Sequence, residues 1–167
     1  MEVGVTAEEE TIRQEVLALS ASIAFRRRNY DVATRLCSEA AARIVRTGVS
    51  FPLYYWTVFM VAEVMIGLRL QSDGDPGELE RWIARIHRVL KREARVHKVA
   101  EPSYLLAEGY RAFFGGRTDA AHNAWREAKT LAARLQLARE AKYATWLLTT
   151  DGWASNVGRG RLSATKA

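Results

Sequence analysis

Apolar residues recur three and four positions apart along most of the chain, which is the spacing of one face of an α-helix. All three prolines, at positions 52, 76 and 102, fit the first turn of a helix, where a missing backbone N–H costs little. The pattern therefore predicts an all-α protein. The seven expected helices cover residues 6–28, 32–48, 52–70, 76–97, 102–114, 118–135 and 139–149.

The first two helices are expected to form an antiparallel hairpin, because only a short turn at residues 29–31 separates them. Thr6 and Glu9 have the spacing of a capping box at the start of the first helix. Gly48 suits a left-handed cap at the end of the second. The apolar stripes are Ile12, Val16, Leu19 and Ile23 in the first helix and Val32, Leu36, Ala40 and Ile44 in the second.

The later helices have their own start and stop signals. Asp75 and Pro76 combine an N-cap with a first-turn proline, and Pro102 opens the fifth helix. The glycines at 115 and 116 end that helix, and Thr118 or Asp119 is expected to cap the sixth. Residues 151–167 lack a core-forming pattern, so we expect a single domain over residues 1–150 and a flexible C-terminal tail.

The longest apolar run, residues 51–70, has the length of a membrane span. Its nine Leu, Ile, Val and Phe residues favour insertion by roughly 0.3 to 0.6 kcal/mol each, whereas Glu63 near its middle opposes insertion by about 2.5 to 3.5 kcal/mol. These contributions nearly cancel, and the flanking amphipathic helices need a protein surface to cover. We therefore expect a buried central helix and no membrane span.

The composition limits the class of protein and its cellular location but does not indicate an activity. The 167 residues are 49% hydrophobic and 26% charged, which is ordinary for a globular domain. The formal charge of +6 permits attraction to acidic proteins, nucleic acid or anionic lipid and selects none of them. The single Cys37 cannot form an internal disulfide and is expected to be a small packed residue. With the acidic start after Met1, this favours a cytoplasmic location.

Small and large residues repeat between the first and third predicted hairpins. Six positions of the first, Leu17, Ala21, Ala24, Ala33, Cys37 and Ala40, align at a constant interval with Leu105, Gly109, Ala112, Ala121, Trp125 and Ala128. The second hairpin, which includes Gly67, fits more loosely. Small residues let a partner helix approach, and a large residue such as Trp125 fills the next gap.

Gly109, Gly116, Ala121, Trp125 and Ala128 stand at the spacing of the small and large positions of a tetratricopeptide repeat, which the chain resembles. The resemblance implies a right-handed superhelical array of three antiparallel helix hairpins closed by a C-terminal capping helix. More narrowly, residues 51–148 resemble the C-terminal repeat region of bacterial multidomain signalling proteins that join a nucleotide cyclase to a P-loop ATPase. Neither catalytic domain of those proteins has a counterpart in this chain.

In such an array the first helix of each hairpin lines a concave groove, where repeat proteins usually bind. The residues expected there are Phe25, Val61, Val64, Leu68, Leu106, Tyr110, Phe113 and Phe114. So apolar a groove suits a hydrophobic helix, a peptide, a lipid-like ligand or a second copy of the chain. The alternative is that a short curved array closes on itself and these residues are core.

Five arginines on the predicted fourth helix form a second candidate surface: Arg81, Arg85, Arg88, Arg92 and Arg95. Their spacing places them on one face, which could contact phosphates in a salt-dependent manner. This helix is expected on the outer side of the array, and no aromatic residues are expected to interleave with the arginines as a stacking platform would require. A solvated surface is the alternative interpretation.

Candidate catalytic residues are sparse. His87, His97 and His122 are isolated in the sequence and are expected at the surface or at helix ends, so no metal or cofactor site is predicted. Glu63 should pair with an arginine from a neighbouring helix or have a raised pKa. The sequence thus predicts a non-catalytic interaction or scaffold module, which could belong to a larger signalling protein. The alternatives are an anion or nucleic-acid binder and a small helical enzyme with a pocket near Glu63.

Overall fold

The computed structural model describes residues 6–48, 54–71 and 77–149, and these residues form helices and no strands. The predicted all-α class is therefore confirmed. The predicted signals at Pro52, Asp75 and Pro76, and the tail at 151–167, lie outside the described residues. The elements are α1 (Ala7–Arg26), α2 (Tyr30–Thr47), α3 (Tyr55–Gln71), α4 (Gly77–Val96), the short 3₁₀ helix η2 (Lys98–Ala100), α5 (Glu101–Phe114), α6 (Thr118–Arg134) and α7 (Ala138–Leu147).

Local signals account for both ends of α1 but not for the start of α6. The capping box at α1 is present, with the Glu9 backbone N–H donating to Thr6 Oγ1 at 3.2 Å and Thr6 N–H donating to Glu9 Oε2 at 2.8 Å. Helix α1 ends earlier than predicted because Arg28 adopts a positive φ of 61°, which reverses the chain. The predicted cap of α6 is wrong: Arg117 occupies the N-cap position without a side-chain hydrogen bond, and Thr118 is already helical.

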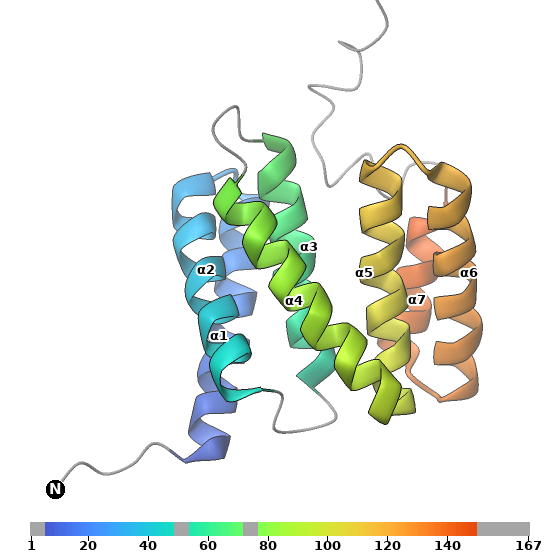
Figure 1. Ribbon diagram of the computed structural model, residues 1–167, viewed down its shortest axis with the longest axis horizontal. Helices are drawn as coiled ribbons and strands as arrows, with labels where there is room; N and C mark the ends of the chain where they lie inside the picture. The colour runs from blue at the N-terminus through green and yellow to red at the C-terminus, as the bar shows by residue number, and fades with distance from the viewer. Residues whose placement is uncertain (1–5, 49–53, 72–76, 150–167) are drawn as a thin grey trace, which may run out of the picture.

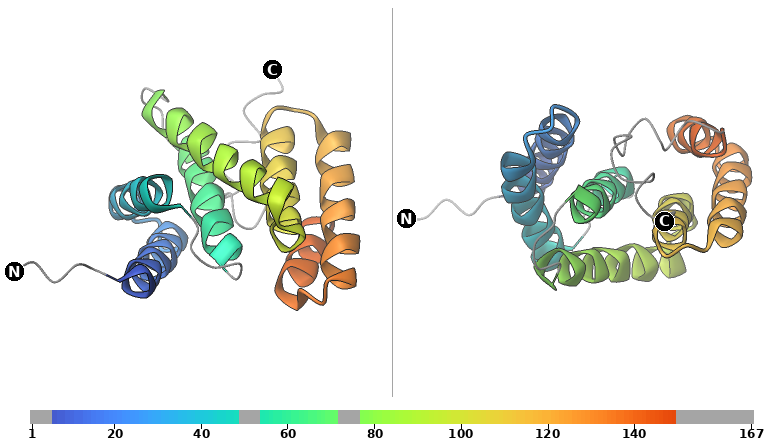
Figure 2. Two further views of the ribbon diagram at one scale, coloured as in Figure 1. Left: turned by 60° about the horizontal axis from the view of Figure 1, so that its bottom comes forward. Right: turned by 90° about the horizontal axis from the view of Figure 1, so that it is seen from above.

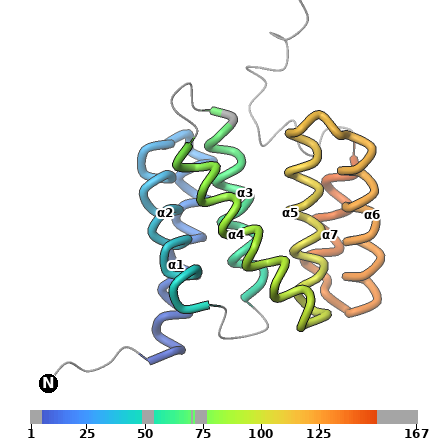
Figure 3. The backbone as a smooth tube through the Cα atoms, in the orientation of Figure 1, coloured from blue at the N-terminus to red at the C-terminus, as the bar shows by residue number. Residues whose placement is uncertain are grey.

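Consecutive helices run in opposite directions and pack beside one another (Figures 1 and 3). Helices α1 and α2 lie at one end of the molecule, and α6 and α7 lie at the other (Figure 2). Helix α4 is tilted relative to the rest and extends from α2 to α5 (Figure 1). Helix α3 contacts α1, α2, α4 and α5, so it occupies the centre.

The central position of α3 explains its composition. Phe59, Val61 and Met65 are completely buried, as expected for a helix covered by neighbours on several sides. This confirms that the longest apolar run supplies a central core helix. Among the described residues, none of the helices has both the length and the hydropathy needed for a membrane span.

Close helix contacts depend on glycine facing an aromatic ring. A Cβ atom added at Gly109 on α5 would lie 2.8 Å from Trp125 Cε2 on α6 and closer still to Nε1. Trp125 is fully buried, and its indole N–H donates to the Leu106 carbonyl oxygen at 3.3 Å. Gly67 on α3 faces the ring of Phe25 on α1 in the same manner. The predicted pairing of small with large residues is therefore present at these contacts.

Helix α1 turns a different face to the core from the one that its sequence suggested. The aliphatic residues Ile12, Val16, Leu19 and Ile23 are 50%, 55%, 45% and 52% exposed. The buried positions are instead Thr11, Gln14, Ala18, Ala21 and Ala24. Alanines let α2 and α3 approach closely, and the Gln14 amide is satisfied because Nε2 donates to Thr47 Oγ1 at 2.7 Å.

Candidate functional site

The structure divides the eight predicted groove residues into two groups. Val61, Val64, Leu68, Leu106 and Tyr110 are buried, whereas Phe25, Phe113 and Phe114 are partly exposed. The first five pack in the core of the isolated chain, in line with the alternative that the sequence left open. Only the three phenylalanines offer apolar area to a partner.

A narrow pocket lies where α1, α3 and α5 meet. Its space for a water-sized molecule is about 20 Å³, enough for a single water. The rings of Tyr110 and Phe114 stack on one side with centroids 5.9 Å apart, and the exposed Arg26 lies on another. The lining residues are Ser22, Phe25, Arg26, Glu63, Val64, Gly67, Tyr110 and Phe114. The pocket is thus too small for a deeply bound ligand. The half-buried phenylalanines Phe25 and Phe114 at its edge, called the aromatic rim below, remain as a surface that a partner could cover.

Glu63 forms a polar cluster with two tyrosines from different helices. The Tyr110 hydroxyl of α5 donates to Glu63 Oε1 of α3 at 3.2 Å, and the Tyr143 hydroxyl of α7 donates to the same oxygen. The two tyrosine oxygens are 2.8 Å apart. Burial raises the pKa of both tyrosines well above 10, and the negative charge of Glu63 raises it further. The hydroxyls therefore stay protonated and act as hydrogen-bond donors.

The donors of this cluster are tyrosine hydroxyls, which the sequence did not predict as partners of Glu63. Arg26 lines the same pocket, but the observed donors come from tyrosines 47 and 80 residues away in sequence. The Tyr143 ring also meets Trp56 and Phe59 edge-on at 5.3 Å. The cluster thus joins α3, α5 and α7 through both hydrogen bonds and aromatic contacts, which is a structural role.

A second polar cluster, which is partly buried, was not predicted from the sequence. His87 on α4 was expected at the surface, but it is only 8% exposed. Its Nε2 lies 2.6 Å from Glu108 Oε2 on α5, and its Nδ1 lies 3.1 Å from Arg111 Nη1. A neutral imidazole that donates from Nε2 to Glu108 and accepts at Nδ1 from Arg111 satisfies both contacts. Of the other histidines, His97 is exposed, as expected, and His122 is half-buried on α6.

The pKa directions agree with that assignment. Burial and the positive charge of Arg111 lower the pKa of His87, which favours the neutral ring. Burial raises the pKa of Glu108, but the hydrogen bonds from His87 and Tyr104 and the positive charge of Arg111 outweigh it and leave the pKa below its ordinary value. Glu108 occupies a position where the repeat pattern expects an apolar residue, and its partner His87 lies 21 residues earlier on a different helix. That departure from the pattern was the only signal in the sequence.

The five arginines of α4, Arg81, Arg85, Arg88, Arg92 and Arg95, are all exposed. Several make local contacts: Arg88 Nε donates to the Ala84 carbonyl oxygen at 3.2 Å, and Arg92 pairs with Glu93 at 2.8 Å. Arg85 lies over the Trp82 ring at 5.0 Å, so an aromatic residue does accompany the arginines, contrary to the sequence interpretation. Arg85, Arg88 and Arg92 line a shallow groove of about 350 Å³ between α2 and α4.

Reactive and metal-binding groups are few in the described residues. Cys37 is fully buried, its Sγ–H donates to the Val61 carbonyl oxygen at 3.4 Å, and burial raises the pKa of the thiol. It is therefore a packed residue, as predicted. Within residues 6–48, 54–71 and 77–149, no three His, Cys, Asp or Glu side chains gather closely enough to hold a metal ion.

Comparison with known proteins assigns no function to the chain. No family model, curated protein or solved structure matches the chain.

Proposed function

We propose that the chain is a protein interaction module built as a right-handed superhelical array of three antiparallel helix hairpins, with α7 as the closing helix. Two observations support this architecture. Consecutive helices are antiparallel neighbours, and Gly109 faces Trp125 at the positions that the tetratricopeptide pattern assigns to a small and a large residue. Cys37, which takes the place of Trp125 in the first hairpin, is also fully buried.

The observation that carries the binding role is the aromatic rim around the pocket between α1, α3 and α5. Phe25 and Phe114 are half-buried in the free chain, so a partner that covers them removes further apolar surface from water. Phe113 meets Phe114 edge-on at 5.4 Å and extends the rim along α5. An apolar helix or extended peptide is the partner that such a surface fits.

The polar groups at the rim suggest how a bound segment is oriented. Arg26 is exposed at the pocket wall, where its guanidinium can donate to a carboxylate or to backbone carbonyls of the partner. Glu63 and Tyr110 also line the pocket, and their hydrogen bond holds the floor in one conformation. The expected partner therefore carries large apolar residues at helical spacing with an acidic residue beside them.

A peptide-display selection against the whole chain tests this function. We expect enrichment of sequences with aromatic or aliphatic residues at i and i+4 and an acidic residue nearby. Binding should fall at least tenfold in Phe114→Glu and should persist in Val96→Glu, a matched change at an apolar position that is 71% exposed on α4. Far-UV circular dichroism verifies that both variants stay helical. Equal binding by Phe114→Glu and the parent chain would rule out the rim as the binding surface.

The arginine surface of α4 supports a second candidate function, the binding of a polyanion. Three of its guanidinium groups line the groove between α2 and α4, together with Val45 and Val89. Affinity for heparin or single-stranded DNA should fall steeply with salt, and a double Arg85→Ser, Arg88→Ser variant should reduce the slope by about 2. A salt-independent affinity would exclude this mode.

A further inference from the structure

The exposed aliphatic stripe of α1, formed by Ile12, Val16, Leu19 and Ile23, has no part in the proposed function. Its members follow one another at intervals of four, three and four residues. In a helix this spacing places them in one line, and it is the spacing of the a and d positions in a helix-to-helix contact. All four are near half exposed, while the opposite face of α1 packs its alanines against α2 and α3.

The two ends of the molecule differ in character. At the α7 end the exposed side chains include Arg139, Lys142 and Thr145, which are polar. At the α1 end the exposed stripe is aliphatic. An apolar end and a polar end do not complement each other, so head-to-tail stacking of copies is disfavoured. Contact between two α1 ends buries the apolar surface on both partners.

We propose that a second copy of the chain docks here, with the two α1 helices antiparallel about a two-fold axis. The spacing of the stripe is the same in both directions. An axis between Val16 and Leu19 therefore sets Ile12 opposite the partner's Ile23 and Val16 opposite the partner's Leu19. Each layer then joins two aliphatic side chains, as an isologous interface requires.

Charge selects the antiparallel orientation over the parallel one. The stripe positions next to its two ends are Glu9, three residues before Ile12, and Arg26, three residues after Ile23. Both side chains are exposed. Antiparallel docking sets Glu9 opposite the partner's Arg26 at each end, whereas parallel docking sets like charges against each other. The charged flanking residues near the axis, Arg13 and Glu15, have the partner's Ser20 and the partner's Ser22 as their nearest neighbours across the contact.

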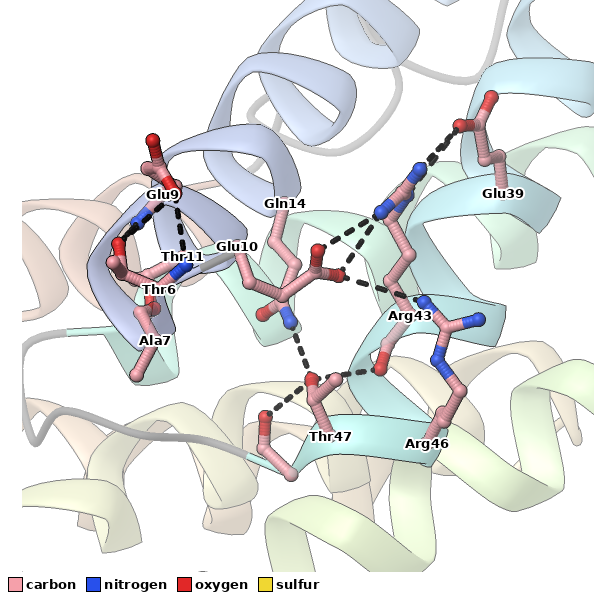
Figure 4. A network of polar contacts seen from close by, with 11 residues as sticks. Thr6, Ala7, Glu9, Glu10, Thr11, Gln14, Glu39, Arg43, Arg46 and Thr47 are labelled. Atoms are coloured by element: carbon pink, nitrogen blue, oxygen red, sulfur yellow. Dashed lines mark hydrogen bonds and ion pairs between the residues drawn. The ribbon is translucent and has the colours of Figure 1, made fainter. Parts of the chain in front are cut away.

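A network of polar contacts holds this stripe in place (Figure 4). Glu10 of α1 points toward α2 and pairs with Arg43 at 2.9 Å, and Gln14 donates to Thr47 at 2.7 Å. These contacts fix the rotation of α1 on α2, so its aliphatic side is presented outward without rearrangement. Two grooves between α1 and α2, of about 260 and 450 Å³, lie beside the stripe. They can accept the partner's aliphatic side chains.

The size of the contact sets the expected affinity. Helix α1 has 20 residues and is therefore about 30 Å long, so an α1 pair with the flanking side chains of α2 buries less than the roughly 800 Å² per partner of a standard interface. Half-buried Val32 and Leu36 of α2 line one of the grooves and add to it. We expect a dimer with a dissociation constant on the order of micromolar.

Sedimentation velocity of the whole chain between about 1 and 200 µM tests the association. The parent chain should shift from monomer to dimer, and a double Val16→Glu, Leu19→Glu variant should remain monomeric with unchanged helicity. Val96→Glu and Phe114→Glu should dimerise as the parent does, which separates the aliphatic stripe from the phenylalanine rim, although Arg26 borders both surfaces. A parent chain that stays monomeric throughout overturns the proposal, and so does a dimer that survives the double substitution.

Disulfide trapping tests the orientation. A mixture of the Ile12→Cys and Ile23→Cys variants under mild oxidation should give the mixed disulfide dimer, and either variant alone should give little. The native Cys37 does not interfere because it is fully buried. Efficient homodimer formation by Ile12→Cys alone would overturn the antiparallel arrangement, since only parallel docking sets that position against itself.

Discussion

Replacing Gly109 with alanine tests whether the contact between α5 and α6 depends on a missing side chain. At an open position inside a helix this change stabilises a protein by about 1 kcal/mol, because alanine has the higher helix propensity. At Gly109 the new Cβ would overlap the indole of Trp125. The ring is fully buried and can move only by displacing its packed neighbours.

The magnitude follows from three contributions. Overpacking a core typically costs about 1 to 3 kcal/mol. Moving the indole also weakens its 3.3 Å hydrogen bond to the Leu106 carbonyl oxygen, which contributes about 1 kcal/mol. The helix propensity of alanine offsets about 1 kcal/mol. We therefore expect Gly109→Ala to lower the free energy of unfolding by about 1 to 3 kcal/mol, a large share of the 5 to 15 kcal/mol typical of a domain.

Urea denaturation followed by circular dichroism measures this loss. With a slope of about 2 kcal/mol per molar, the midpoint should fall by roughly 0.5 to 1.5 M. Gly67→Ala is the matched control and should lower the midpoint less than Gly109→Ala does. The Phe25 ring that faces Gly67 is partly exposed and can rotate away. In a Trp125→Phe background the effect of Gly109→Ala should become smaller, since the shorter ring leaves space. A Gly109→Ala variant more stable than the parent would refute the reasoning.

Four further predictions concern titratable and reactive groups. The pKa of His87 is lowered from its ordinary 6.5, so the unfolded chain binds that proton first as the pH falls. The stability contribution of His87 should therefore be full above pH 6.5 and decline below it. In thermal melts at a series of pH values, this decline should be absent from His87→Gln. The lowered pKa of Glu108 should add a second decline below pH 4.5 in the same melts. Because the pKa values of Tyr110 and Tyr143 are raised, their contribution to stability should be full below pH 10 and fall above it. In an alkaline titration, these two tyrosines should ionise at higher pH than the exposed ones, and Phe variants of both should remove that late part of the tyrosinate absorbance. The Cys37 thiol should react with a disulfide reagent only at the rate of unfolding, and rapid labelling of the native chain would contradict its burial.

The helical class and the central core helix could be predicted because the information is local. The apolar run around Phe59 and Met65 has no polar side, so it must be covered from several directions. The contact of Gly109 with Trp125 could also be anticipated, since a small residue opposite a large one follows from the repeat interval. These features depend on size and spacing alone.

The orientation of α1 could not be predicted, because two of its sides are apolar. The aliphatic stripe from Ile12 to Ile23 is the more hydrophobic, yet the alanine side packs inward. Close approach of α2 and α3 favours small side chains, and that preference depends on the surfaces of those helices. Hydrophobicity along one helix does not contain this information.

The polar clusters escaped prediction for a related reason. Glu63 meets Tyr143 across 80 residues, and His87 meets Glu108 only because tilted α4 reaches α5. Each partner is set by the angle between helices and leaves no fixed spacing in the sequence. The carboxylate of Glu63 could be recognised from its place inside an apolar run, but its tyrosine partners could not, and the burial of His87 left no signal of its own.

The most direct test of the proposed interaction module is an amide NMR titration of the whole chain with the highest-affinity peptide from the display selection. Shift changes should gather at the rim around Phe25, Gly67 and Phe114, from α1, α3 and α5 together. Changes confined to the arginines of α4, or the absence of saturable changes, would contradict the account.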